Sequence, residues 1–135
     1  MSNQPLSLFE ISGRAMAAQL VRLNTTASNL ANAGTISGSE QNAFRSLKPV
    51  FRTVMGENGT ATVAIDKSVS SPAAPTKRHD PAHPLADKNG DVWEAAVDSA
   101  AEMVEMLETS RQYQNNVQVL QTAKSLTLET LRLGQ

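Results

Sequence analysis

The sequence predicts a mainly α-helical protein whose long N- and C-terminal helices pack as an antiparallel, coiled-coil-like pair. Two amphipathic segments lie at the two ends of the 135-residue chain, and a polar middle rich in Pro and Gly separates them. β-prone runs in that middle predict a small β-hairpin with extended loops around it. We therefore expect residues 1–33 and 94–135 to form one helical domain. Residues 34–93 are expected to supply a loop, the hairpin and a Pro-rich connector.

The first segment reads as a helix from about Pro5 to Ala33. Its apolar residues recur at steps of four and three from Met16 to Leu30, which is typical of a helix in coiled-coil-like packing. Pro5 suits the first turn, because an N–H there would have no helical partner in any case. Gly34 favours a stop just beyond the segment.

The end of this segment is unusually polar. The run from Ser28 to Asn32 contains Asn29 and Asn32 on either side of Leu30, and Asn and Ser are indifferent helix formers. Two interpretations remain open. The run is either a fraying helix end, or its carboxamides form hydrogen bonds across a helix–helix interface and define its register.

The middle of the chain reads as loops around one hairpin. Residues 34–42 are mostly small and polar, which predicts an extended or mobile loop. The β-prone runs 50–55 and 60–65 are joined through a Gly- and Asn-Gly-containing connection, which is a hairpin signal. An isolated hairpin is marginal in water, so we expect it to pack on a helix or a neighbour. Residues 70–75 read as a linker, and the two prolines of 80–90 predict a fixed irregular connection.

The last segment, from about Glu94 to Leu131, contains neither Gly nor Pro. A helix of that length extends on the order of 55 Å, which is more than a small globular core usually supports. We therefore expect it to lie in a bundle or a filament. Its apolar stripe at steps of three and four includes Met103, Met106, Tyr113, Val117, Leu120 and Leu131, with Leu107 alongside.

Composition supports a chain that completes its burial by association. Apolar residues make up only 40% and aromatic residues 4% of the chain, so the free monomer is expected to be marginally stable. The net charge of −1 supplies no field for binding nucleic acid. We see no secretory signal peptide and no run of apolar residues long enough for membrane insertion. By default the chain is expected in the cytoplasm, unless a route without a cleaved signal exports it.

Few residues have the chemistry of a catalytic or metal site. His79, His83 and Asp87 are metal-ligand types, but Pro81 and Pro84 prevent the helix that would place both histidines on one face. A Pro-stiffened loop with incidental histidines is the favoured interpretation. There is no Cys, nucleophile motif or phosphate-binding loop. The sequence therefore predicts a protein that is not an enzyme, with no catalytic residue, no metal and no cofactor.

An ordered set of motifs along nearly the whole chain resembles the axial rod proteins of the bacterial flagellar basal body, and is closest to the proximal-rod members of that family. The motifs are Arg22-Leu23-Asn24, Ala27 to Asn32, Pro84 to Asp87 with Gly90, Ser110-Arg111, Tyr113-Gln114, and Thr130 to Gln135. The family's usual Pro is absent from the segment Asp91 to Val97, so an earlier start of the last helix is compatible with this sequence.

The resemblance implies a structural subunit without catalysis. It implies export without a cleaved signal through the flagellar type III apparatus, and helical polymerisation into the periplasmic rod that transmits torque. The paired terminal helices are implied to form an inner axial domain around the export channel. Implied partners are copies of itself, other flagellar rod proteins, basal-body ring or adaptor proteins and the export apparatus, without nucleic acid or membrane insertion.

We expect the assembly interface to involve apolar and amide residues of both helices: Met16, Leu20, Leu23, Asn29, Leu30, Asn32, Leu107, Arg111, Tyr113, Val117, Leu120 and Leu131. A Leu→Asp change at Leu23 or Leu120 is then expected to block assembly. The alternative is a soluble helical adaptor that binds partner peptides or helices in the cytoplasm. Such an adaptor would be a folded monomer that melts cooperatively on its own.

Overall fold

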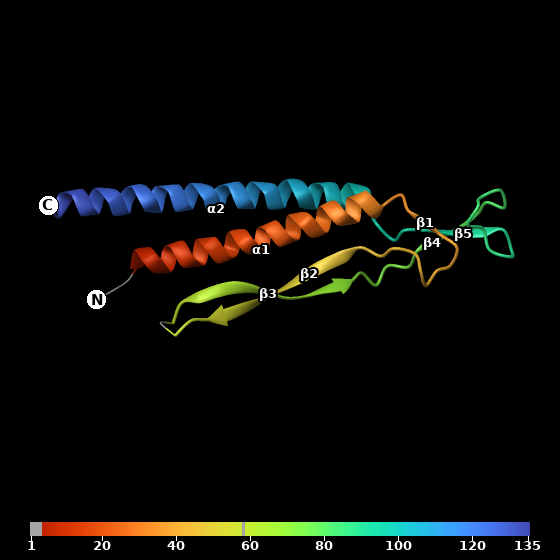
Figure 1. The fold of residues 1–135 in the computed structure, drawn as a ribbon, viewed down its shortest axis with the longest axis horizontal. Helices are drawn as coiled ribbons and strands as arrows, with labels where there is room; N and C mark the ends of the chain where they lie inside the picture. Colours follow the sequence, from red (N-terminus) through yellow and green to blue (C-terminus); the bar gives the residue numbers. More distant parts are fainter. Residues whose placement is uncertain (1–3, 58) are drawn as a thin grey trace.

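The computed structural model describes residues 4–57 and 59–135, with side chains described from Leu8 onward. The molecule is elongated (Figure 1), with two long helices side by side and two small sheets. In chain order the elements are α1 (Gln4–Asn32), β1 (Ile36–Ser37), β2 (Leu47–Met55), β3 (Ala61–Ser70), β4 (Thr76–His79), β5 (Asp91–Glu94) and α2 (Ser99–Leu133). About 47% of the chain is helix and 24% is strand. The predicted terminal helices are confirmed, but the fold is mixed rather than mainly α.

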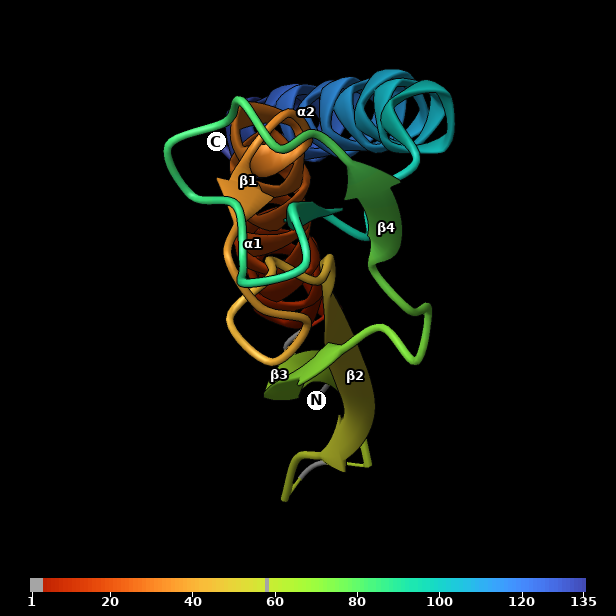
Figure 2. The same cartoon turned by 90° about the vertical axis from the view of Figure 1, so that its right-hand side faces the viewer.

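The helices run in opposite directions. Contacts between their side chains pair Gln19 with Gln112, Arg22 with Glu105 and Asn29 with Glu102, so residue numbers rise on α1 as they fall on α2. Seen end-on in Figure 2, α1 lies between α2 and the β2–β3 hairpin. Because α1 covers only one side of α2, most of the surface of α2 faces solvent.

α2 begins at Ser99, later than the predicted start near Glu94, and the idea of an earlier start is wrong. Asp98 is its N-cap: the carboxylate accepts hydrogen bonds from the N–H groups of Ala100 and Ala101, at 3.0 and 3.1 Å. The preceding residues have other backbone partners. Asp91–Glu94 forms β5, so the chain is extended there whether or not a Pro is present.

The predicted hairpin is confirmed and is longer than the β-prone runs. β2 and β3 pair antiparallel from Leu47↔Ser70 to Met55↔Ala61, with a register shift between Val50 and Phe51. The hairpin packs along α1, where Phe51 and Val63 face Ala18 across a cavity of about 130 Å³. Asn58, part of the predicted connection, lies outside the described residues.

A second sheet was not predicted from the sequence. β1, β5 and β4 form it in that order, with Ile36 opposite Glu94 and Arg78 opposite Val92. The loop predicted for residues 34–42 therefore contains a strand. Strands of two and four residues are too short to show alternation, and Lys77 and Arg78 make β4 look like a surface loop.

The hydrophobic core is thin. Val92 is the largest fully buried apolar side chain among the described residues, and the rest of the buried apolar set is Ala18, Ala43, Ala95 and Ala123. The chain exposes 9201 Å² of surface, whereas a compact monomer of 14.4 kDa exposes about 6,800 Å². This arrangement leaves much of the apolar surface for contacts beyond the chain itself.

Candidate assembly interface

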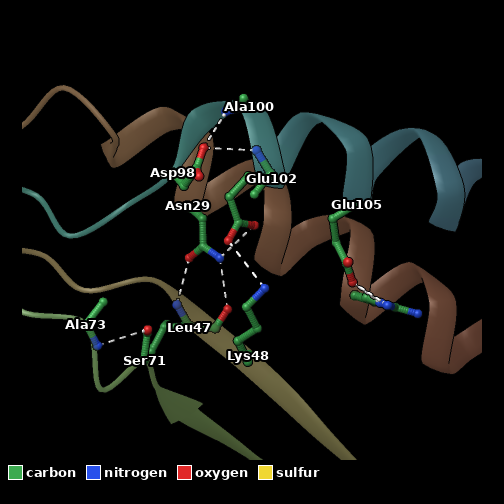
Figure 3. A network of polar contacts seen from close by, with 11 residues as sticks. Asn29, Leu47, Lys48, Ser71, Ala73, Asp98, Ala100, Glu102 and Glu105 are labelled. Carbon is green, nitrogen blue, oxygen red and sulfur yellow. Dashed lines mark hydrogen bonds and ion pairs between the residues drawn. The ribbon is translucent and has the colours of Figure 1, made fainter.

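Asn29 connects three elements (Figure 3). Its carboxamide nitrogen donates to the carbonyl oxygen of Leu47 at 2.8 Å and to a carboxylate oxygen of Glu102 at 3.1 Å. Its carboxamide oxygen accepts from the Leu47 N–H at 2.8 Å. Asn29 is only 1% exposed, so it is not part of a fraying helix end. One side chain thus holds the first residue of β2 against both helices.

We call the contacts of Asn29 with Leu47 and Glu102 the junction. Its acidic member, Glu102, is buried in the first turn of α2. Its carboxylate lies 3.7 Å from the Lys48 ammonium and near the positive end of the helix dipole, and both stabilise its charge. One turn later, Glu105 forms an ion pair with Arg22 of α1. These polar contacts fix how α1 and α2 are aligned along their length.

The seam between the helices is lined mainly by small and polar side chains. Ser12 and Thr26 are buried on the face of α1 that carries Gln19 and Arg22, and Thr109 and Ala123 are buried on the face of α2 that carries Gln112 and Glu105. The Thr109 hydroxyl is buried without a hydrogen-bond partner among the described residues. Small side chains bury little apolar area, so this seam supplies little of the hydrophobic free energy that a long helix pair can provide.

The large apolar side chains of α2 lie mostly outside the seam. Leu107 is 68% exposed and Leu131 64% exposed. The full set of exposed large apolar residues on α2 is Met103, Val104, Leu107, Val119, Leu126, Leu128, Leu131 and Leu133. Exposed apolar surface of this extent on a small protein is typical of an interaction face.

Relatives of known identity agree with an assembly role. A family model described as "Flagella basal body rod protein" matches residues 9–35, and one described as "Flagellar basal body rod FlgEFG protein C-terminal" matches residues 88–133. Over 132 residues, covering 96% of this chain and 98% of the relative, the chain is 46% identical to the flagellar basal-body rod protein FlgC of Salmonella typhimurium. The chain belongs to the flagellar basal-body rod protein family.

Two further rod proteins named FlgC, from Escherichia coli O157:H7 and Yersinia enterocolitica, are 43% and 42% identical with the same coverage. This rod protein is accordingly a structural subunit of the flagellar basal body. Neither helix of the described residues is both long and apolar enough to cross a membrane.

The structure places the predicted interface residues of the rod protein in three environments. Asn29 is buried at the junction. The half-buried group is Met16, Leu23, Leu30, Asn32, Tyr113, Val117 and Leu120, and the exposed group is Leu20, Leu107, Arg111 and Leu131. Asn32 does not bond across the helices, because its carboxamide nitrogen donates to the Ser28 carbonyl oxygen of its own helix.

Six exposed large apolar residues of α2 were absent from the predicted interface: Met103, Val104, Val119, Leu126, Leu128 and Leu133. A signal for part of this set was present in the sequence. Val119, Leu126 and Leu133 are seven residues apart, the spacing of one row in a coiled coil. The stripe chosen from the sequence lay on a neighbouring face of the same helix.

The second sheet of the rod protein has its own charged cluster, centred on Asp91. The Lys77 ammonium lies 2.6 Å from one carboxylate oxygen and His79 Nδ1 lies 2.8 Å from the other. The hydrogen bond from Lys77, reinforced by the one with His79, holds the pKa of Asp91 below its usual value. The same contact with Asp91 raises the pKa of Lys77. These pairs hold β4 on β5.

The two histidines considered as metal ligands have separate roles. His79 pairs with Asp91, and His83 Nδ1 accepts a hydrogen bond from the Leu85 N–H at 3.1 Å. Across residues 4–57 and 59–135, the structure contains no group of three or more His, Cys, Asp or Glu residues that could hold a metal ion.

Proposed function

We propose that this chain is a proximal-rod subunit that polymerises helically into the periplasmic shaft, which transmits torque and surrounds the export channel. The observation that carries the proposal is the distribution of apolar side chains. The helix pair buries small and polar residues, while Leu107 and Leu131 face outward. A subunit with this distribution gains its main hydrophobic burial only when neighbours cover α2.

In this proposal the terminal segments 1–33 and 94–135 form the inner axial domain, packed in a coiled-coil-like manner in the assembled rod. Residues 34–93 form a collar that contacts neighbouring subunits. The junction at Asn29 supports this division, because it ties β2 to both helices and sets the hairpin at a defined height along them. Of the twelve predicted interface residues, the buried and half-buried ones are proposed to make contacts within the subunit, and the exposed ones are proposed to contact neighbouring subunits.

The proposed partners are copies of this chain, other rod proteins, ring or adaptor proteins of the basal body, and the flagellar type III export apparatus. Export without a cleaved signal requires a chain that unfolds readily. The thin core supports this requirement, since Val92 is the largest apolar side chain that the described residues bury fully. The role is structural, and no cofactor is involved.

The test is deletion of the gene followed by complementation. We expect the deletion strain to lose motility and to lack rods. Restoring the gene should return swimming, and the chain should appear in purified basal bodies after detergent and salt washes. Normal swimming of the deletion strain would overturn the proposal. A cooperative, concentration-independent monomer absent from basal bodies would instead favour a cytoplasmic adaptor.

A further inference from the structure

One threonine of α2 is turned away from its own helix. The hydroxyls of Thr122, Thr127 and Thr130 each donate to the carbonyl oxygen four residues earlier, at 3.0, 2.8 and 2.8 Å. Thr109 makes no such bond, because its hydroxyl has no hydrogen-bond partner among the described residues although the residue is 0% exposed. A buried hydroxyl without a partner costs free energy, so a further polar group is needed at this point of the seam.

A second buried polar atom without a partner lies on the facing helix. The carboxamide oxygen Oε1 of Gln19 is buried and accepts no hydrogen bond from the described residues. The carboxamide nitrogen of Gln19 is already used, because it donates to Gln112 Oε1 at 2.9 Å. The two unpartnered oxygens therefore lie on opposite helices, one on α1 and one on α2.

The orientation of the Gln19 carboxamide follows from its neighbours. The ionised carboxylate of Glu108 can only accept hydrogen bonds, and the carboxamide nitrogen of Gln112 donates to it at 3.2 Å. The oxygen of Gln112 is therefore the atom that faces Gln19. Gln19 must present its nitrogen to that oxygen, which leaves its own oxygen without a donor. Turning over either amide, or both, would bring two acceptor oxygens together.

Thr109 lies close to this pair of amides. It precedes Gln112 by three residues, which puts both side chains on one face of α2, about 5–6 Å apart at Cβ. Gln19 contacts Gln112, and the next contact along the seam joins Arg22 to Glu105, so Thr109 lies between the two contacts. One water molecule with two hydrogen bonds of about 2.8 Å each can join oxygen atoms up to about 5.6 Å apart. That reach matches the spacing.

We propose that the seam binds one water molecule between Thr109 and Gln19. The Thr109 hydroxyl donates to the water oxygen, and the water donates one hydrogen to Gln19 Oε1. Its other hydrogen is donated to Gln112 Oε1, which has a second lone pair besides the one that accepts from Gln19. Three polar partners is the usual number for a buried water. The site belongs to the folded subunit and is independent of the proposed role in the rod.

The bound water ties the middle of α1 to the middle of α2. Sliding one helix past the other by a turn, about 5.4 Å, takes Thr109 and Gln19 beyond the reach of one water and leaves both oxygens unpartnered. A polar layer of this kind specifies the register of a helix pair. It adds to the alignment that Arg22 and Asn29 set through their contacts with α2.

Thr109→Val tests the site by the sign of its effect on stability. Val has nearly the shape and the helix propensity of Thr but no hydroxyl. We expect the equilibrium constant for unfolding in urea to rise roughly tenfold, because Gln19 Oε1 is left buried with a water that has lost a partner. Thr122→Val is the matched control, since exposed Thr122 bonds within its own helix, and it should change the constant by less than about threefold.

A double-mutant cycle tests whether Thr109 and Gln19 share the ligand. Gln19→Met keeps an unbranched side chain of similar length without the amide. Because both residues bind one water, the double variant should be at least about threefold more stable, in its unfolding constant, than the sum of the single effects predicts. A high-resolution crystal structure of the full chain should show solvent density within hydrogen-bond distance of both Thr109 Oγ1 and Gln19 Oε1.

Three results would overturn the water site. Thr109→Val as stable as wild type, or more stable, would show a dry site, since removing an unpartnered hydroxyl removes its cost. Additive effects in the cycle would show that the two oxygens have separate partners. A crystal structure in which Thr109 bonds directly to Gln19, or to the carbonyl oxygen of Glu105, would also refute it. The crystal structure needs no variant, so it decides the question even where a substitution prevents folding.

Discussion

Asn29 satisfies two backbone groups of β2 and one buried carboxylate with a single side chain. The Leu47 N–H donates to the Asn29 carboxamide oxygen, and the carboxamide nitrogen donates to both the Leu47 carbonyl oxygen and the Glu102 carboxylate. Buried polar groups that lose their partners are costly, because they were desolvated on folding. The stability of the junction therefore depends strongly on this one residue.

We expect Asn29→Ala to lower the free energy of unfolding by about 2–4 kcal/mol through the loss of these three hydrogen bonds. Asn32→Ala is the matched control, since the side chain of Asn32 donates only to the Ser28 carbonyl oxygen of its own helix and the residue is partly exposed. That change should cost less than about 1 kcal/mol. Urea unfolding monitored by circular dichroism measures both. Equal losses would show that the junction does not stabilise the fold.

At Asp91, stability should depend on pH in a defined direction. The lowered pKa of Asp91 means that its ion pair stabilises the folded chain above pH 3.8 and loses this effect as pH falls through the folded-state pKa. The raised pKa of Lys77 means that the effect persists up to pH 10.5 and is lost at higher pH. The advantage of wild type over Asp91→Asn should therefore be largest between these limits.

The fluorescence of Trp93 reports on unfolding near Asp91. Trp93 is the single tryptophan of the chain, and it lies on β5 with the Lys77 ammonium 5.9 Å from the centroid of its ring. Its fluorescence during urea unfolding at several pH values measures the difference between wild type and Asp91→Asn. Asp66→Asn, at an exposed pair with Arg52, serves as the control and should have little effect at any pH. A difference that does not vanish in acid would contradict this account.

Among the elements, α2 carries its large apolar residues on the side away from α1. A charge at Leu107 should therefore leave the monomer intact and block burial in the rod. We expect Leu107→Asp to abolish swimming and to remove the chain from basal bodies, while the helicity of the dilute protein stays unchanged. Leu107→Met, which keeps an apolar side chain of similar volume at the same position, is the control and should swim normally.

Swimming by Leu107→Asp at wild-type speed would mean that this face of α2 stays in solvent in the assembled rod. The changes first suggested by the sequence, Leu23→Asp and Leu120→Asp, separate a loss of assembly from a loss of folding less well. Both residues are half-buried on the helix pair, so a charge there would also destabilise the monomer. Exposed positions isolate assembly from folding.

At the scale of the whole molecule, the large exposed surface area limits the stability of the free monomer. The chain keeps 9201 Å² exposed and buries few large apolar side chains. We expect weak, concentration-dependent stability, because association with other copies stabilises the folded state by mass action. Thermal unfolding by circular dichroism at several protein concentrations should show a midpoint that rises with concentration. A midpoint that is high and independent of concentration would contradict the assembly proposal.

Sequence periodicity was sufficient for the long elements. It located both helices and the hairpin, because each has enough residues for a three-four step or a β-prone run with a turn to be visible. It was insufficient for β1, β4 and β5, whose pairing joins residues 36–37 and 76–79 to 91–94. Such short strands are defined by distant partners rather than by their own pattern.

The sequence alone determined that this chain has two terminal helices, a hairpin and the motifs of a flagellar rod subunit, because each of these depends on residues close together in the chain. The tertiary structure decided which side of each helix is covered. It showed Asn29 joining α1, α2 and β2 while Asn32 bonds within its own helix, and it showed Leu107 exposed where Thr109 is buried. A rotation of a helix by one residue, about 100°, separates those alternatives, and only packing against other elements sets that rotation.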